Sequence, residues 1–400
     1  MKLKAANPGS WGNNLQVQVD HDVAEEAAKR YGLTKADLFN LTVKDTVTGA
    51  VEEFRNLSVK DSPRRVDLVL ENESRLVRIE LNPLTDTIPV SKNLAGGSDS
   101  NPLEVVDYCA SESEKKGIYA LEKADIFNLL CIPPDSVDGD LPSGVITSAA
   151  SYCEKRRAMM IVDCPSSWTS KETAKAGISA IGTNSKNAAL FFPRLRQPNP
   201  LQGNQMGTFV PCGAVAGVFA RTDTQRGIWK APAGLDATLV GVPQLSVPLT
   251  DMENGELNPL AINCLRSMPA AGRIIWGSRT LQGDDRLSSE WKYIPVRRMA
   301  LYIEESLYRG TQWVVFEPND EPLWAQIRLN VGSFMHGLFR QGAFQGASPK
   351  EAYFVKCDKE TTIQDDINKG IVNILVGFAP LKPAEFVVIK IQQMAGEIQT

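Results

Sequence analysis

Asp163 and Cys164 are the residues best able to do chemistry in this sequence, and they stand side by side in the run MMIVDCP. A carboxylate next to a thiol could supply a base and a nucleophile. Ligands of doubly wound sheets bind beyond the carboxyl ends of the strands, which here are Pro133–Ser136 and Asp163–Ser167. No histidine lies near the pair in sequence, so a strand-terminal aspartate that caps the next turn is the stronger interpretation. An α/β metabolic enzyme with an Asp163/Cys164 site stays as the alternative.

Other patterns of catalytic or metal-binding sites are missing from the sequence. His21 and His336 are the only histidines, and they lie in a loop-like stretch and on the flank of a helix pattern, which gives little support to a histidine metal site or a catalytic triad. Phosphate-binding, dinucleotide-binding and nucleophile-elbow motifs do not occur. The seven cysteines are scattered without a C-x-x-C pair, as is typical of buried thiols in a reducing compartment. We therefore expect no catalytic residue, no cofactor and no metal.

A second charged group lies in TTIQDDINKG, where Asp365 and Asp366 precede Lys369. Acidic residues are favourable near the N-terminus of a helix, so the stretch could be a solvated helical turn. It could equally be an acidic face that docks a basic partner. The sequence leaves both interpretations open.

The elements that must position these residues are of two kinds, and the first is an antiparallel β module. Short alternating runs follow one another from about Asn14 to Leu81, separated by turn-like residues: NNLQVQVD, DLFNLTVKD, AVEEFRNLSV, RRVDLVLEN and RLVRIEL. Alternation of this kind indicates strands with one wet face. A loop rich in Pro, Gly, Ser and Asn comes next, so we assign residues 1–95 to a β-rich module.

The second kind is an alternation of strand and helix over residues 96–379. Apolar runs at Asp125–Pro133, Met159–Pro165 and NAALFFPRL are separated by the helix patterns GVITSAASYCEKRRA and SKETAKAGISAIG. Continuous apolar runs joined by helices predict a mostly parallel sheet that helices cover on both faces. The fold class is therefore α/β, or α+β when the β module is included.

Two further helices are predicted at Val296–Arg309 and Leu323–Gln341, each with one apolar stripe. Asp320 is placed to cap the second helix. Between them, WVVF is predicted to be a strand, and EAYFVKCD and IVNILVGFAP are predicted to follow as further strand segments.

The last pattern in the chain is a strand without an evident partner. Pro380 and Pro383 break what precedes it, and residues 380–400 are assigned to a C-terminal arm. The strand comprises Phe386, Val387, Val388, Ile389, Lys390, Ile391 and Gln392. Its peptide groups need a neighbour to bond to.

Bulk composition agrees with an ordinary soluble protein of two or three domains: 400 residues, 43% hydrophobic, 22% charged. The formal charge of −4 gives no reason to expect nucleic acid as a partner. No apolar run approaches the roughly 18 residues of a membrane span, and the first residues lack the apolar region of a secretory signal. We expect synthesis in the cytosol and no direct membrane insertion.

Long motifs in this sequence resemble one family. INCLRSMPAAGRIIWGSRTLQGD, WKYIPVRRMALYIEESLYRGTQWVVFEPNDEPLW, FVKCD and GFAPLKPAEFVVIKI closely resemble the tail sheath proteins of contractile phages and phage-tail-like injection systems. NPGSWGNNLQVQV, LEKADIFNLLCIP and RGIWKAPAG match the same family in the same order. The resemblance therefore covers nearly the whole chain.

The resemblance implies a structural subunit rather than an enzyme. Such subunits polymerise helically around an inner tube and contract to drive the tube through a target envelope. The implied partners are further copies of this chain, an inner tube protein, and baseplate and terminal cap proteins, assembled in the bacterial cytoplasm into a virion tail or a tail-like particle. A non-contractile tail or baseplate component is the remaining structural alternative.

The resemblance also suggests roles for particular residues. It implies that Phe386–Gln392 pairs with a neighbouring subunit, and it makes Asp365, Asp366 and Lys369 candidates for contact with the tube. Family members normally begin with an arm, often reading like PGVYVEE, and a further strand and helix region before NPGSWGN. Only MKLKAA precedes that motif here, so the sequence looks like a fragment of a family member, and its sheet would lack the strands of the leading region.

Overall fold

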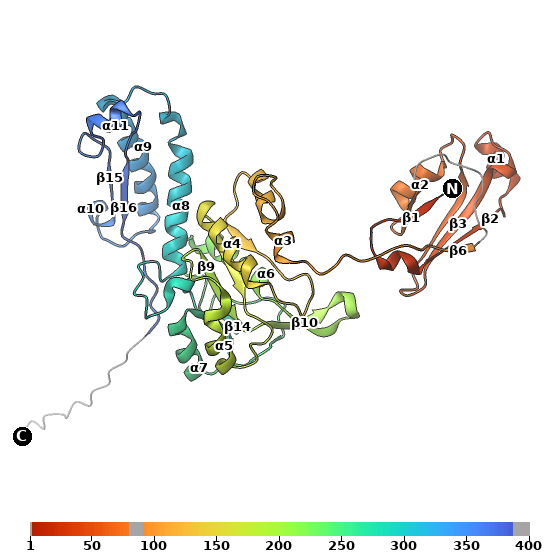
Figure 1. Cartoon of the computed structure of the whole chain (residues 1–400), viewed down its shortest axis with the longest axis horizontal. Helices are drawn as coiled ribbons and strands as arrows, with labels where there is room; N and C mark the ends of the chain where they lie inside the picture. The colour runs from red at the N-terminus through yellow and green to blue at the C-terminus, as the bar shows by residue number, and fades with distance from the viewer. Residues whose placement is uncertain (1, 80–90, 387–400) are drawn as a thin grey trace, which may run out of the picture. The chain divides into compact units, whose positions relative to one another are not determined.

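The computed structural model describes residues 2–79 and 91–386 (Figure 1). The chain divides into two compact units, Met1–Pro102 and Leu103–Thr400. The first unit is mainly antiparallel sheet, and the second combines a helix-covered sheet with a helical region that carries a small pair of strands. The protein is therefore of the mixed α/β class.

Strands of the first unit form a sheet of order β4–β3–β2–β6 and a separate pair, β1–β5, and all these pairings are antiparallel. The strands are β1 (Leu3–Ala5), β2 (Leu15–Asp20), β3 (Leu38–Asp45), β4 (Val51–Ser58), β5 (Val77–Ile79) and β6 (Ser91–Asn93). Along β2, Leu15, Val17 and Val19 are buried and the residues between them are exposed, because successive side chains of a strand point to opposite faces. One face of this sheet therefore carries the core of the unit.

The stretch RRVDLVLEN, predicted to be a strand, is instead the helix α2 (Val66–Glu73). Val66, Leu68 and Leu70 alternate as they would in a strand. However, Val66, Val69 and Leu70 also have the i, i+3, i+4 spacing of a helix face. These three side chains are buried, whereas Leu68 is 47% exposed. The residues that are buried are therefore those that share one face of a helix.

The short helix α1 (Glu25–Arg30) packs in a small hydrophobic cluster next to β3.

The second unit is built on a five-stranded sheet of order β14–β13–β9–β8–β7. Its strands are β7 (Leu129–Cys131), β8 (Met159–Asp163), β9 (Ala188–Phe192), β13 (Ile262–Met268) and β14 (Gly272–Ile275). The first four run parallel to their neighbours, and β14 is antiparallel to β13. All five residues of β9 are buried, since the sheet is covered on both faces.

The helices that cover this sheet include α4 (Ser143–Lys155), α5 (Lys171–Gly177), α6 (Cys212–Arg226) and α8 (Ile294–Gly310). Leu190 and Phe192 face a hydrophobic cluster that α4 and α5 close, while Phe191 faces a second cluster that α6 and α8 close. The α5 helix begins at the predicted place, where the Ser170 side chain accepts a hydrogen bond from the Thr173 amide, as expected of an N-cap.

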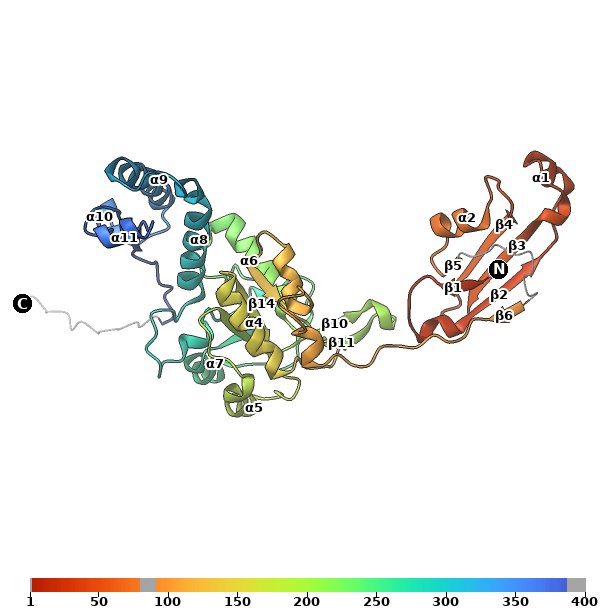
Figure 2. The same ribbon diagram turned by 45° about the horizontal axis from the view of Figure 1, so that its top comes forward.

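Smaller elements complete the second unit. They are α3 (Val105–Tyr108), α7 (Asp251–Leu257), β10 (Leu195–Asn199), β11 (Gln205–Phe209) and β12 (Gln244–Leu245). The hairpin of β10 and β11 extends away from the sheet (Figure 2). In the described part of the chain, the 3₁₀ helices are η1 (Ser10–Asn14), η2 (Lys35–Asp37), η3 (Gly117–Lys123), η4 (Ile178–Ile181), η5 (Pro200–Gln202), η6 (Asn258–Leu260), η7 (Leu281–Gly283) and η8 (Gln312–Val314).

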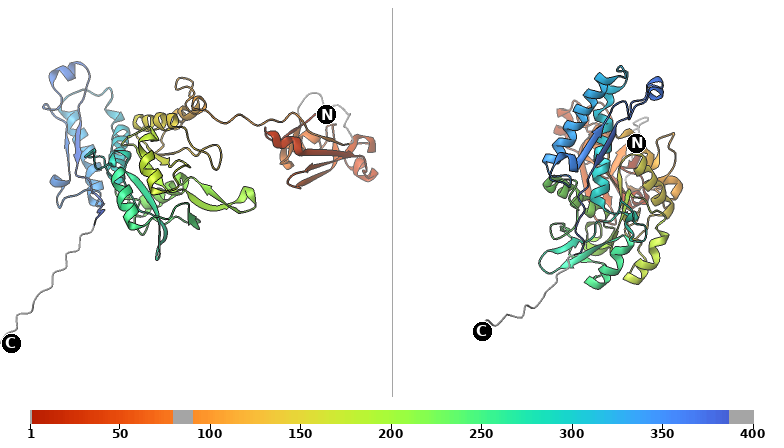
Figure 3. Two further views of the ribbon diagram at one scale, coloured as in Figure 1. Left: turned by 60° about the horizontal axis from the view of Figure 1, so that its bottom comes forward. Right: turned by 90° about the vertical axis from the view of Figure 1, so that its left-hand side faces the viewer.

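The C-terminal part of this unit joins α8 to a second helix and a strand pair. The elements are α9 (Glu321–Arg340), α10 (Pro349–Ala352), β15 (Tyr353–Lys356), α11 (Gln364–Asn368) and β16 (Leu375–Phe378). Met299 and Ile303 of α8 pack against α9, whereas Leu301 of the same helix belongs to the cluster on the sheet. Asp320 caps α9 by accepting a hydrogen bond from the Glu321 amide (2.7 Å). Strands β15 and β16 lie against α9 (Figure 3).

The predicted strand WVVF is wrong, because η8 and a turn occupy these positions. Trp313 is 40%, Val315 62% and Phe316 101% exposed, and the chain here only connects α8 to α9. An apolar, β-branched run forms a strand where the edge of a sheet is available for pairing, and no sheet edge is available at this turn.

Within residues 2–79 and 91–386, we find no helix with both the length and the apolar character needed to cross a membrane.

Two leucines of α2 provide a matched test of its period. Leu70→Ala removes a fully buried side chain and should reduce the free energy of unfolding of the first unit by about 2–5 kcal/mol. Leu68→Ala removes an exposed side chain and should change it by less than about 0.5 kcal/mol. Hydrogen exchange of β3 amides, followed by mass spectrometry, measures both effects. Equal destabilisation by the two variants would contradict the helix.

Candidate subunit-interaction site

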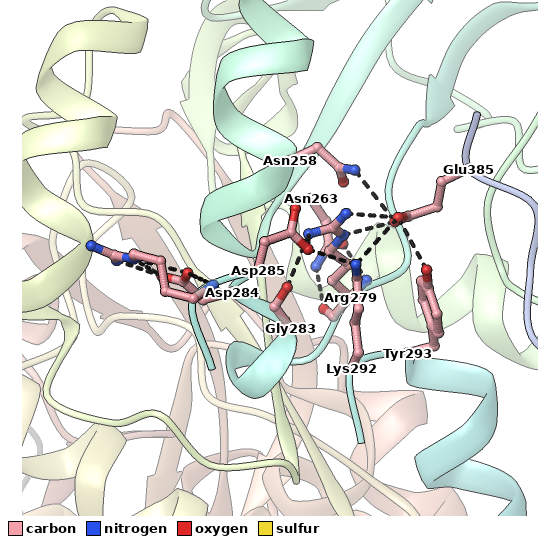
Figure 4. Close-up of polar contacts among 10 residues, drawn as sticks. Asn258, Asn263, Arg279, Gly283, Asp284, Asp285, Lys292, Tyr293 and Glu385 are labelled. Carbon is pink, nitrogen blue, oxygen red and sulfur yellow. Dashed lines mark hydrogen bonds and ion pairs between the residues drawn. The ribbon is translucent and has the colours of Figure 1, made fainter. Parts of the chain in front are cut away.

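The predicted partner-binding strand begins at the end of the described chain. Phe386 is 71% exposed, and residues 387–392 of that strand lie outside the described residues. The residue just before it, Glu385, is by contrast held by the body of the second unit (Figure 4). The candidate site is therefore the attachment point of the C-terminal segment.

Arg279 holds this segment through a bidentate ion pair. Its side chain is fully buried, and its Nε and Nη2 atoms donate to Glu385 Oε1 (2.7 Å) and Oε2 (2.6 Å). The third guanidinium nitrogen, Nη1, donates to the Gly283 carbonyl and to Asp285 Oδ1, both at 3.0 Å. Two parallel bonds between guanidinium and carboxylate are a strong and directional contact.

Asn263 on β13 positions Arg279. Its Oδ1 atom accepts a hydrogen bond from the Arg279 amide (2.7 Å), and its Nδ2 atom donates to the Arg279 carbonyl (2.8 Å) and to the Leu190 carbonyl of β9 (3.0 Å). The loop passes so close to β13 that a Cβ at Gly277 would lie 2.8 Å from the Asn263 Cα. Glycine is therefore required at position 277 if the arginine is to reach its place.

Further donors surround the Glu385 carboxylate (Figure 4). Tyr293 Oη donates to Oε2 at 3.2 Å, Asn258 Nδ2 donates to Oε1 at 3.3 Å, and Lys292 Nζ lies 3.9 Å from Oε2. Burial alone would raise the pKa of Glu385, but the hydrogen bonds and charge of Arg279 outweigh it and leave the pKa below its ordinary value. The carboxylate therefore stays ionised in the folded protein.

A cavity of about 670 Å³ lies beside this ion pair. Its lining includes Trp229, Lys230 and Trp276, and also the C-terminal segment from Leu381 to Phe386. Ser278 is also among the residues of its lining, although its Oγ atom is itself buried. The lining of the cavity thus includes two aromatic side chains.

The alternative enzyme site at Asp163 and Cys164 does not have the geometry for catalysis. Asp163 Oδ1 accepts a hydrogen bond from the Cys212 amide at the start of α6 (2.8 Å), so it caps that helix rather than the next turn. Burial raises the pKa of Asp163 to about 6 and that of the Cys164 thiol to about 12. A thiol that is closed to solvent and protonated at neutral pH is a poor nucleophile.

The other sequence candidates have local structural partners. His21 Nδ1 lies 3.1 Å from the Leu38 carbonyl, and His336 Nδ1 lies 3.3 Å from Tyr353 Oη. All seven cysteines lie in the described part of the chain and are free thiols. Over residues 2–79 and 91–386, no group of three or more His, Cys, Asp or Glu side chains could hold a metal ion.

The acidic stretch forms α11, a short exposed helix. Asp365 pairs with Lys369 one turn later, and their side chains are 64% and 59% exposed. Asp366 accepts hydrogen bonds from Asn373 Nδ2 (3.0 Å) and from the Ile363 amide (3.3 Å). These charges are thus partly satisfied within the helix and its flanks, and the proposed contact with a tube stays a prediction.

Sequence reasoning missed Arg279 and Glu385. Both lie in motifs that carry the family resemblance, WGSRTLQGD and PAEF, but neither was singled out. Arg279 follows the apolar run Ile274–Trp276 by three residues, and this closeness to an apolar strand is the signal that could have indicated a buried charge, since a buried arginine needs a carboxylate partner. The identity of that partner could not be read from spacing, because it is 106 residues away.

Comparison with known proteins gives a consistent result. Residues 287–394 match the phage tail sheath C-terminal domain. The chain is 32% identical to the contracted helical sheath of the anti-feeding prophage (AFP), over 73% of this chain and 76% of that one, with a TM-score of 0.60. It is 29% identical to the contracted sheath of the extracellular contractile injection system PVC, over 68% and 72% of the chains, also with a TM-score of 0.60. A putative prophage major tail sheath protein of Pseudomonas aeruginosa (strain UCBPP-PA14) is 24% identical over 74% of both chains.

Glu385→Gln should loosen the C-terminal segment without unfolding the second unit. The variant loses the ionic part of the contact, while Arg279 keeps Asp285 and the Gly283 carbonyl. We expect the segment to lose about 1–3 kcal/mol of local stability, measured as faster amide exchange in residues 379–386. Arg286→Gln is the control. The Arg286 side chain is exposed, so its ion pair with Asp284 should contribute less than about 1 kcal/mol to stability.

The same ion pair should respond to acid. Because the pKa of Glu385 is lower when folded, its contribution is fully present above the ordinary value of 4.5 and is lost as the pH falls through the folded pKa. Amide exchange of residues 379–386, corrected for its intrinsic pH dependence, should therefore rise in acid. The Gln variant should lack this step, and an identical response of both proteins would show that Glu385 is not the titrating group.

Proposed function

This chain belongs to the contractile tail sheath family and is a structural subunit of such a sheath, and we propose that copies of it polymerise by exchanging the strand that follows Glu385. The observation that carries the proposal is the Arg279–Glu385 ion pair. It holds the chain up to Glu385 against the subunit, while the Phe386 side chain is already directed to solvent. An anchored start with a β-rich sequence beyond it is suited to pairing with another copy.

The proposed acceptor is the strand pair β15–β16. Tyr353 and Val355 turn one face of the pair toward α9, and Phe354 and Leu375 on the other face are each 53% exposed. Among the described residues, β15 and β16 form a sheet of only two strands, so each keeps an edge of unpaired peptide groups. A two-stranded sheet is marginally stable on its own, and an added strand would both satisfy its edge and lengthen it.

Strand exchange between different surfaces gives an open polymer. The donor, beyond Glu385, and the acceptor, β15–β16, are different parts of the chain, so each copy can receive one neighbour and reach another. Contacts of this heterologous kind build helical filaments when the rotation does not close. Contraction would then be a rigid-body reorientation of subunits, with each exchanged strand kept in place by its ion pair.

We further propose the partners of the polymer. The sleeve would surround an inner tube protein and drive it through a target envelope. Asp365, Asp366 and Lys369 on the exposed helix α11 would contact the tube. A solved AFP structure related to this chain at 30% identity is a baseplate complex, which supports a baseplate partner, and a terminal cap protein would close the other end. Assembly would occur in the bacterial cytoplasm.

Deletion of residues 387–400 tests the strand exchange while keeping Glu385 and its ion pair. The shortened subunit should stay folded but fail to form tubes. Even two net hydrogen bonds of about 1 kcal/mol each correspond to roughly a 30-fold loss in association constant. Electron microscopy and sedimentation of the full and shortened chains, each produced with the tube protein, measure this loss. Ordered tubes from the shortened chain at the same concentration would refute strand exchange.

Reversing charge on α11 tests the tube contact. Asp365→Lys combined with Asp366→Lys should weaken binding of the tube protein several-fold to about tenfold at low salt, and less at high salt. Glu360→Lys is a matched control because Glu360 is a similarly exposed acid that pairs with Lys356. Pull-down with the purified tube protein gives the measurement. Equal binding by the double variant and the control would show that α11 faces solvent and does not contact the tube.

A further inference from the structure

The turn between α8 and α9 exposes an apolar group that we name the aromatic knob: Trp313, Val315 and Phe316. Phe316 is fully exposed and has a φ of +72°, a left-handed conformation that is an outlier for a bulky residue. Neighbouring large apolar side chains that are exposed to water do not stabilise a monomer, and such groups often mark interaction sites. Their exposure therefore indicates a contact surface.

The knob is held rigidly rather than hanging from a loose loop. Val314, in its middle, packs into the cluster shared by α8 and α9. On its C-terminal side, Asn319 accepts a hydrogen bond from Trp324 Nε1 and donates to the Ile371 carbonyl, both at 2.9 Å. A surface that is ordered before contact loses less entropy when it binds.

A complementary hollow lies elsewhere on the same unit, in the cavity of about 670 Å³ beside the C-terminal segment. We name it the tryptophan socket and define it by Trp229, Lys230, Asn254, Trp276 and Ser278. The socket is therefore a hollow that has two indole rings in its lining.

The charges around the two surfaces are opposite. Arg226, Lys230 and Lys382 line the socket, where Arg226 pairs with Asp236 and the acid of the lining, Glu385, pairs with Arg279. The knob is followed directly by Glu317, and then by Asp320, which caps α9, and by Glu321, which pairs with Arg328. Opposite charge at the rim of a contact favours the encounter and fixes its orientation.

The knob and the socket of one copy cannot meet. The Ser278 carbonyl accepts a hydrogen bond from the amide of Ile294, the first residue of α8 (3.0 Å), whereas the knob follows Gly310, the last residue of α8. A helix of 17 residues is about 25 Å long, so the two surfaces lie at opposite ends of α8. Any contact between them must join two copies.

We propose that the aromatic knob of one copy inserts into the tryptophan socket of a second copy, with Phe316 between Trp229 and Trp276. This contact rests on the proposed polymer and adds to it. Strand exchange joins copies through the segment after Glu385, whereas the knob and socket join them through surfaces of the folded unit. A head-to-tail contact of this kind is heterologous and so extends a filament.

Photo-crosslinking tests the contact directly. Benzoylphenylalanine in place of Phe316, in the full chain assembled with its tube protein, should crosslink between copies to peptides that contain Trp229 or Trp276, as mapped by mass spectrometry. Phe316→Ala should raise the concentration needed for half-maximal assembly about tenfold or more. Leu329→Ala is the matched control, because Leu329 is a 75% exposed apolar residue on α9 outside both surfaces.

The outcomes separate this inference from the function on which it rests. Tubes that form normally from Phe316→Ala, with crosslinks that map to the tube protein or to residues 387–400 instead of the socket, would overturn the contact and leave the sheath function standing. If the unmodified chain itself forms no polymer with its tube protein, the proposed polymerisation fails first. Because Phe316 is fully exposed, the alanine variant should fold, and circular dichroism checks that it does.

Discussion

Arg279 places a guanidinium where water does not reach, and a buried charge without a partner costs several kcal/mol. Two of its three partners, Gly283 and Asp285, come from the same loop, while Glu385 comes from the far end of the described chain. A shift of the C-terminal segment by one residue would remove Glu385 and leave Arg279 paired with Asp285 alone, through one of its three guanidinium nitrogens. This pair therefore fixes the register of the C-terminal segment at Glu385.

The rest of the second unit supplies a rigid support for that pair. The sheet is covered on both faces, and α8 belongs to two hydrophobic clusters at once, through Leu301 on the sheet side and Met299 and Ile303 on the α9 side. Because one helix serves both clusters, the strand pair β15–β16 and the turn after α8 keep a defined geometry relative to the sheet. A polymer built from such subunits can change its packing while each subunit stays intact.

Helices and strands could be predicted from the sequence where a long run of residues fits one period only. The strand expected at Met159–Pro165 is confirmed as β8, because its continuous apolar run reflects a sheet buried on both faces. Short runs were assigned wrongly. Val66–Glu73 fits both the strand period and the helix period. The residues after Gly310 have strand-forming side chains but no sheet to join. The ion pair of Arg279 could not be predicted at all, since apolar periodicity says nothing about which distant charges meet in space.

Asn263 has a mechanical consequence. Its side chain connects the Arg279 backbone to the Leu190 carbonyl of β9, one of the inner strands of the five-stranded sheet. Tension applied to the C-terminal end of the chain would pass from Glu385 through Arg279 and Asn263 into β13 and β9, whose hydrogen bonds share the load across neighbouring strands. A pull from outside would thus be resisted by the buried sheet of the unit.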